Sequence, residues 1–98
     1  MRKAERLGRD YAETVAIRAL GWLVGNDELR SVFLGASGLA PEELSQRAGD
    51  PDFLISVLDF ILMDDAWITA FCDAEGLSYD VPMAARSALP GGAETHWT

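Results

Sequence analysis

FLGASGLAPEEL (residues 33–44) is followed 38 residues later by FCDAEGLSYDVP (residues 71–82), and both stretches start with Phe and reach Gly-Leu after the same interval. A helix often ends at a glycine in the left-handed conformation, and the residue after that glycine then packs back on the last turn. The two stretches therefore predict two equivalent helix stops, each with a leucine folded back on a phenylalanine: Gly38, Leu39 and Phe33 in the first, and Gly76, Leu77 and Phe71 in the second.

The sequence around these stops is typical of helices, because apolar residues recur at helical spacing and no stretch shows the sustained alternation of a strand. We expect a first helix from Asp10, which would act as N-cap with Glu13 as its capping-box partner, to Gly25. Further helices are expected over residues 27–37, 41–48 (opened by Pro41), 51–64, about 65–75 and about 80–89, with Asn26 or Asp27, Asp50, Asp64 or Asp65, and Asp80 or Ser78 as caps.

One face of each longer helix is expected to be buried. The fourth helix is apolar on most of its circumference, which favours a central position in a bundle. Trp22 and Trp67 are expected in the core, although either could anchor an interface. The expected inward positions are Ala12, Val15, Ala16, Ala19, Leu20, Leu23; Leu29, Val32, Phe33, Ala36; Phe53, Leu54, Val57, Leu58, Ile61, Leu62; and Trp67, Ile68, Ala70, Phe71, Ala74.

An internal repeat is suggested by the same offset of 38 residues. Without a gap it aligns Ile17 with Ile55 and Asp27 with Asp65, as well as the two helix stops. The fold expected is all-α: a compact bundle of five to six short helices with a pseudo-twofold repeat of a helix–helix–short helix unit. Shared capping rules alone could also produce the likeness. The domain would cover residues 10–90, with copies at about 10–47 and 48–85, between a basic extension (1–9) and a flexible tail (91–98).

The charge of the chain is unevenly distributed. Four of its eight basic residues are Arg2, Lys3, Arg6 and Arg9, which are candidates for contacts with a partner, while residues 10–98 hold 15 acidic and four basic residues. Such an acidic body repels a phosphate backbone and attracts basic surfaces, or it serves only solubility. No signal peptide or membrane span is recognisable, and a single cysteine permits no internal disulfide, so we expect a cytoplasmic protein.

The chain offers few groups for catalysis or for binding a metal ion or cofactor, so we expect no enzyme, no metal site and no cofactor. Its only histidine, His96, is close to the C-terminus, and Cys72 has no neighbouring cation to lower its pKa. Asp64 and Asp65 are explained as helix caps. A helix-turn-helix outline is present around Gly38, but the acidic residues 42 and 43 stand where DNA contacts should fall.

The function favoured by the sequence is therefore a non-catalytic protein–protein interaction module whose acidic surface meets a basic partner. Self-association into a homo-oligomer is a variant of this hypothesis. Two alternatives come from other classes: a small helix-turn-helix-like DNA-associated regulator, and a ligand-binding helical bundle. Nucleic-acid binding is the less expected of these, because of the acidic body.

The segments ETVAIRALGWLVGNDELRSVFLGASGL (residues 13–39), PEEL (41–44), DFLISVLDFILMDD (52–65) and ALPGG (88–92) together resemble a short alphaproteobacterial family of uncharacterised helical proteins, domain of unknown function 3572. The resemblance covers about residues 10–92. It implies a small helical cytoplasmic protein and supplies no activity, cofactor or functional residue.

Overall fold

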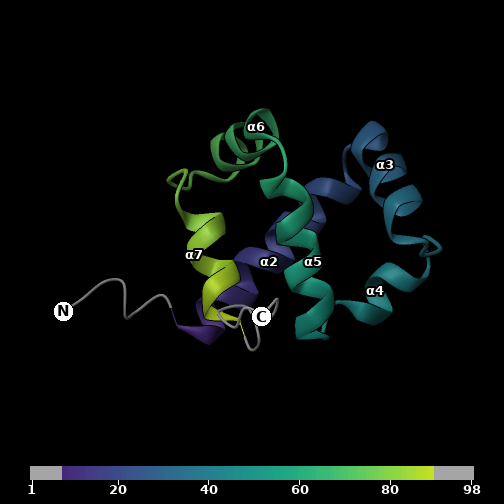
Figure 1. Ribbon diagram of the computed structural model, residues 1–98, viewed down its shortest axis with the longest axis horizontal. Helices are drawn as coiled ribbons and strands as arrows, with labels where there is room; N and C mark the ends of the chain where they lie inside the picture. The colour runs from purple at the N-terminus through teal and green to yellow at the C-terminus, as the bar shows by residue number, and fades with distance from the viewer. Residues whose placement is uncertain (1–7, 90–98) are drawn as a thin grey trace, which may run out of the picture.

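Six α-helices, labelled α2 to α7 in Figure 1, make up the computed structural model, which describes residues 8–89. No strand occurs within these residues, so the predicted all-α class is confirmed. The helices are α2 (Arg9–Val24), α3 (Asp27–Ser37), α4 (Glu43–Arg47), α5 (Pro51–Leu62), α6 (Asp65–Glu75) and α7 (Val81–Ala88).

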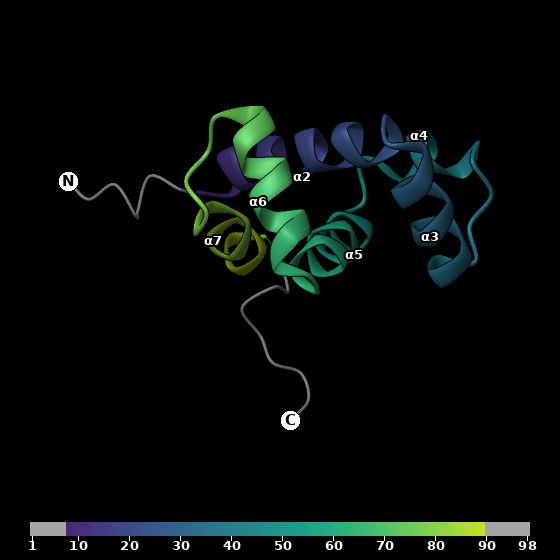
Figure 2. The same cartoon turned by 90° about the horizontal axis from the view of Figure 1, so that it is seen from above.

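The core lies between α2, α5 and α7, which pack against one another. Helix α3 folds back from the end of α2, and α6 folds back from the end of α5, so α3 with α4 and α6 with α7 lie on opposite sides of the molecule (Figures 1 and 2). The central position predicted for the fourth helix is confirmed. Six of the twelve residues of α5 are buried: Phe53, Leu54, Val57, Leu58, Phe60 and Ile61.

The inner face of α2 agrees with the helical spacing, because all six residues predicted to be inside are buried. The predicted N-cap of this helix is wrong. The N-cap is Gly8, which has no side chain to accept a capping hydrogen bond. Helix α2 begins at Arg9, one residue before Asp10, the residue expected to be the cap. Glu13 is not a capping-box partner either: its Oε2 lies 3.5 Å from Nε of Arg9, one helical turn away. Arg9 therefore belongs to the helix and not to an extension.

The buried stripes of α3 and α6 are narrower than predicted. In α3 only Leu29 and Phe33 are buried, and Val32 and Ala36 are exposed, contrary to prediction. In α6 the exposed residues Ala70 and Ala74 were likewise expected inside, whereas Phe71 and Cys72 are the buried pair. Both helices lie at the periphery, so neighbouring helices cover only a narrow face of each.

The short helix α4 starts later than predicted. Pro41 and Glu42 form a turn, and the helix begins at Glu43. The backbone N–H of Ala40 donates to Oε1 of Glu43 at 2.7 Å, which fixes the chain before the helix in the manner of a capping box. Leu44 is the one buried residue of α4.

The predicted internal repeat stays a hypothesis. The corresponding helices α3 and α6 have the same length of 11 residues and both end at a glycine with positive φ. The third helices differ, since α7 packs against both α2 and α5 whereas α4 has few helix contacts (Figure 1). The structure thus does not show a pseudo-twofold arrangement of copies 10–47 and 48–85.

Candidate functional site

Both glycine stops have the left-handed backbone that their spacing predicts, with φ of 76° at Gly38 and 70° at Gly76. Both glycine N–H groups donate to the carbonyl four residues earlier, that of Leu34 for Gly38 and that of Cys72 for Gly76. The second stop adds a bond from the following residue, in which the N–H of Leu77 donates to the carbonyl of Cys72 at 2.9 Å. The second stop is therefore a Schellman-type cap and the first a simpler left-handed cap.

The residues around these glycines belong to the core and not to a binding site. Phe33 and Phe71 are buried, and Leu39 and Leu77 are half-buried against the core. The six residues of the two stops thus shape the ends of α3 and α6. They expose no polar group beyond the backbone that could carry chemistry.

Among residues 8–89, two side chains have a shifted pKa, and both lie near the turn between α6 and α7. Cys72 is fully buried, and its Sγ lies 3.4 Å from the carbonyl oxygen of Ser78. Burial, followed by the charges of Asp73 and Asp80, raises the pKa of this thiol. The exposed Tyr79 donates its hydroxyl to Asp73 at 2.7 Å, and this hydrogen bond raises the pKa of the phenol.

This turn is poorly suited to catalysis. A raised thiol pKa reduces the fraction of reactive thiolate, and the buried sulfur is not accessible to a substrate. The depression lined by Asp73, Leu77, Ser78 and Tyr79 is shallow and open. No pattern in the sequence predicts the Tyr79–Asp73 hydrogen bond, because this bond depends on how the chain turns after Gly76.

Asp64 and Asp65 do not form a paired carboxylate site. Oδ1 of Asp64 accepts a hydrogen bond from the backbone N–H of Ala66 at 2.8 Å, and Asp65 lies in the first turn of α6. Within residues 8–89, no three side chains of His, Cys, Asp or Glu converge as a metal site would require.

The helix-turn-helix outline is also weak in three dimensions. The would-be recognition helix α4 has only five residues, with Glu42 as its N-cap and Glu43 as its first residue. Its one basic residue, Arg47, lies 3.7 Å from Asp50, with its guanidinium 5.8 Å from the ring centre of Phe53. No helix within residues 8–89 has the length and hydropathy needed to cross a membrane.

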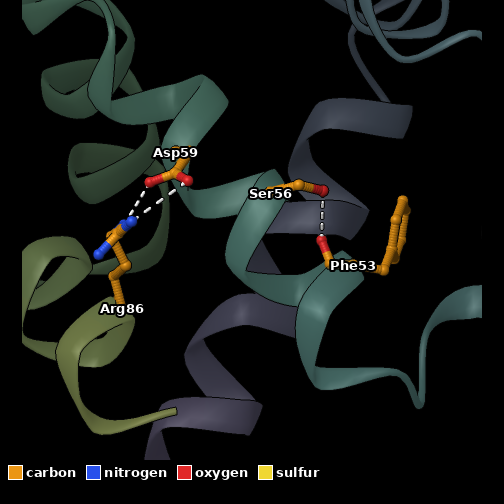
Figure 3. A network of polar contacts seen from close by, with 4 residues as sticks. All are labelled: Phe53, Ser56, Asp59 and Arg86. Atoms are coloured by element: carbon orange, nitrogen blue, oxygen red, sulfur yellow. Dashed lines mark hydrogen bonds and ion pairs between the residues drawn. The ribbon is translucent and has the colours of Figure 1, made fainter. Parts of the chain in front are cut away.

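Ion pairs involve every basic residue of the described part of the chain. Arg86 on α7 binds both carboxylate oxygens of Asp59 on α5 (Figure 3). One turn before Asp59, the hydroxyl of Ser56 donates to the carbonyl of Phe53. Arg18 joins α2 to α6 through Glu75 at 2.9 Å. The three remaining pairs are local and link Arg9 to Glu13, Arg30 to Asp27 and Arg47 to Asp50.

The acidic residues outnumber these arginines by 14 to five in residues 8–89, so a set of carboxylates is left without a cationic partner there. We call these residues the nine unpaired carboxylates: Asp10, Glu28, Glu42, Glu43, Asp52, Asp64, Asp65, Asp73 and Asp80. Of the four cations proposed as partner contacts, Arg9 is paired with Glu13, and Arg2, Lys3 and Arg6 lie outside the described residues, as does His96.

The aromatic side chains form a continuous chain from α3 to α6. The ring of Phe33 contacts Phe53 and Phe60 edge-on, with centroids 6.1 and 5.2 Å apart, and Phe60 stacks on Trp67 at 4.8 Å. Trp22 lies apart from this chain, 5.7 Å from Phe71. Both tryptophans were expected in the core, but both are only half-buried at its edge.

Comparison with known proteins gives a family and no activity. No curated protein and no solved structure matches the chain. A family described as "Protein of unknown function (DUF3572)" matches residues 9–92, which include all six described helices. The chain therefore belongs to this family of proteins of unknown function, DUF3572.

Proposed function

We propose that this protein is a non-catalytic interaction module of the cytoplasm that binds a basic protein partner through its acidic surface. The observation that carries the proposal is the charge arrangement of residues 8–89, where each of the five arginines already has an acidic partner and nine carboxylates have none. Unpaired charges of one sign raise the rate of association with a surface of opposite sign.

Two further observations support an interaction role. Within residues 8–89, six large apolar side chains are exposed, namely Tyr11, Ile17, Val32, Met63, Tyr79 and Met83. Within residues 8–89 the titratable groups also lack an arrangement suited to catalysis, since the thiol is buried with a raised pKa and no three His, Cys, Asp or Glu side chains converge on a metal site. The acidic surface weighs against DNA as the partner.

The test is an affinity purification of the tagged full chain from its native cytosol, with bound proteins quantified at low and high salt. We expect a basic protein to be enriched and to be lost as salt rises. A variant that neutralises four unpaired carboxylates should lose this partner: Glu28→Gln, Glu42→Gln, Asp52→Asn and Asp65→Asn.

A matched control removes four charges without changing the net charge: Arg9→Gln, Glu13→Gln, Arg18→Gln and Glu75→Gln. It should retain the partner if it remains folded, as circular dichroism would show. Recovery of the chain alone, or equal loss in both variants, would count against the proposal. A gel shift with duplex DNA and a melting screen with metals and metabolites test the two alternative functions.

A further inference from the structure

The turn between α5 and α6 combines apolar exposure with unpaired negative charge. Met63, the C-cap of α5, is 73% exposed, which is the highest value among the large exposed apolar side chains of residues 8–89. Trp67 follows one turn into α6 and is half-buried, and no group within residues 8–89 accepts a hydrogen bond from its indole N–H. Between them, Asp64 and Asp65 belong to the nine unpaired carboxylates.

The base of this turn is rigid. One face of the Trp67 ring is stacked on Phe60 with an interplanar angle of 20°, and Phe60 in turn contacts Phe33 of α3. Phe33 and Phe60 are 3% and 5% exposed. An indole held in this way loses little conformational freedom when a partner covers its exposed part, which favours Trp as an anchor of interfaces.

The α5–α6 turn lies at the upper end of α5 in Figure 1. We define the upper surface as Met63, Asp64, Asp65 and Trp67. It combines the exposed Met63 and the ring-supported Trp67 with two carboxylates that have no cation as partner within residues 8–89.

We infer that the upper surface binds a basic amphipathic helix of the partner, an inference that rests on the proposed function. The apolar stripe of such a helix would cover Met63 and the exposed part of Trp67, while Lys or Arg beside the stripe would meet Asp64 and Asp65. An exposed methionine adapts to different apolar side chains, which suits helix recognition.

Two other occupants fit less well. An extended peptide adds to a sheet edge, and residues 8–89 contain no strand to extend. A second copy would bring the same unpaired carboxylates, and each described arginine of that copy is already in an ion pair. Like charges would then oppose the contact.

The experiment measures the affinity of the full chain for a fluorescently labelled helical peptide made of Leu and Lys with its leucines on one face. Two control peptides have the same composition with the leucines dispersed around the helix, or Glu in place of Lys. We expect binding of the amphipathic basic peptide only, with a shift of the Trp67 indole N–H signal in NMR spectra.

Two double variants locate the contact. Met63→Ser/Asp65→Asn alters the upper surface, and we expect it to weaken binding by about tenfold, since one anchor and one charge are lost. Met83→Ser/Asp80→Asn makes the same changes around the first turn of α7, where Met83 is 54% exposed, and should change the affinity by less than about twofold.

The possible outcomes separate the two proposals. Equal weakening by both double variants, or equal binding of the dispersed peptide, would contradict helix binding at the upper surface. The proposed function through the acidic surface would still stand. If no basic peptide binds but the cytosolic partner is retained by the unaltered chain, the helix inference alone fails. Loss of the cytosolic partner in the charge-matched control as well would instead count against the proposed function.

Discussion

Replacing a glycine by alanine should destabilise this protein at one position and stabilise it at another, depending on the backbone φ angle. Gly76 has a φ of 70°, a conformation that costs an L-residue about 1 kcal/mol, so Gly76→Ala should lower the free energy of unfolding by about that amount. Gly21 lies inside α2 with an ordinary φ, and a Cβ there would meet no atom within 4 Å. Gly21→Ala should therefore stabilise the protein by up to about 1 kcal/mol. Urea unfolding of both variants measures the two shifts, and shifts of the same sign would contradict this reading.

The buried thiol of Cys72 predicts a dependence of stability on alkaline pH. Its pKa is raised above the ordinary value of 9.0, chiefly by burial, so the folded state keeps a proton that the unfolded state loses. This contribution is complete below the unfolded pKa and is lost as the pH rises from there through the folded pKa. The free energy of unfolding should fall above about pH 9, by at most about 1.4 kcal/mol per pH unit for one proton.

The measurement is urea unfolding from pH 7 to 10.5 for the protein and for Cys72→Ala. The variant should be less stable at pH 7 and should show a shallower decline at alkaline pH. Tyr79 also has a raised pKa, through its hydrogen bond to Asp73, so Tyr79→Phe serves as a second variant to separate the two groups. An unchanged slope in Cys72→Ala would show that the thiol does not carry the effect.

At the scale of elements, the ion pair between Asp59 and Arg86 holds α7 against α5 (Figure 3). The side chains are 48% and 27% exposed, and the sequence separation of 27 residues means that the pair forms only when the helices dock. A double-mutant cycle with Asp59→Asn and Arg86→Gln should give a coupling energy of about 0.5–1 kcal/mol. The local pair of Arg9 and Glu13, with Arg9 62% exposed, is the control and should give about 0.3 kcal/mol. A larger coupling in the control would contradict the assignment.

At the scale of the whole molecule, the surplus of carboxylates predicts how stability responds to salt. Repulsion among nine unpaired carboxylates is spread over the surface, while the five ion pairs are largely exposed and contribute little each. Added NaCl screens both, and the net result should be a higher melting temperature. The four-carboxylate variant should respond less to salt, and its charge-matched control should respond as the unaltered chain does. A melting temperature that falls with salt would show that the ion pairs dominate.

Much of the local structure could be predicted from the sequence, because helix caps and inner faces depend on residues only a few positions apart. The bounds of α3 agree with the prediction, as do the capping role of Asp50 and the inner face of α2. Asn26 and Asp64 are each one of the two caps predicted for their helices. The start of α2 could not be predicted in the same way. A glycine N-cap leaves no side-chain signature, and Asp10 offered a better one.

The sequence by itself determined an all-α chain with two glycine stops, an acidic body and a family of unknown function. The tertiary structure alone decided which residues meet across the chain: the aromatic chain from Phe33 to Trp67, the docking of α7 by Arg86, and the exposure of Val32. The tertiary structure also set the different positions of α4 and α7, although each of these helices follows a similar glycine stop, Gly38 or Gly76. The physical reason is that backbone hydrogen bonds and caps are satisfied within a few residues, whereas burial depends on which neighbours each helix finds in space.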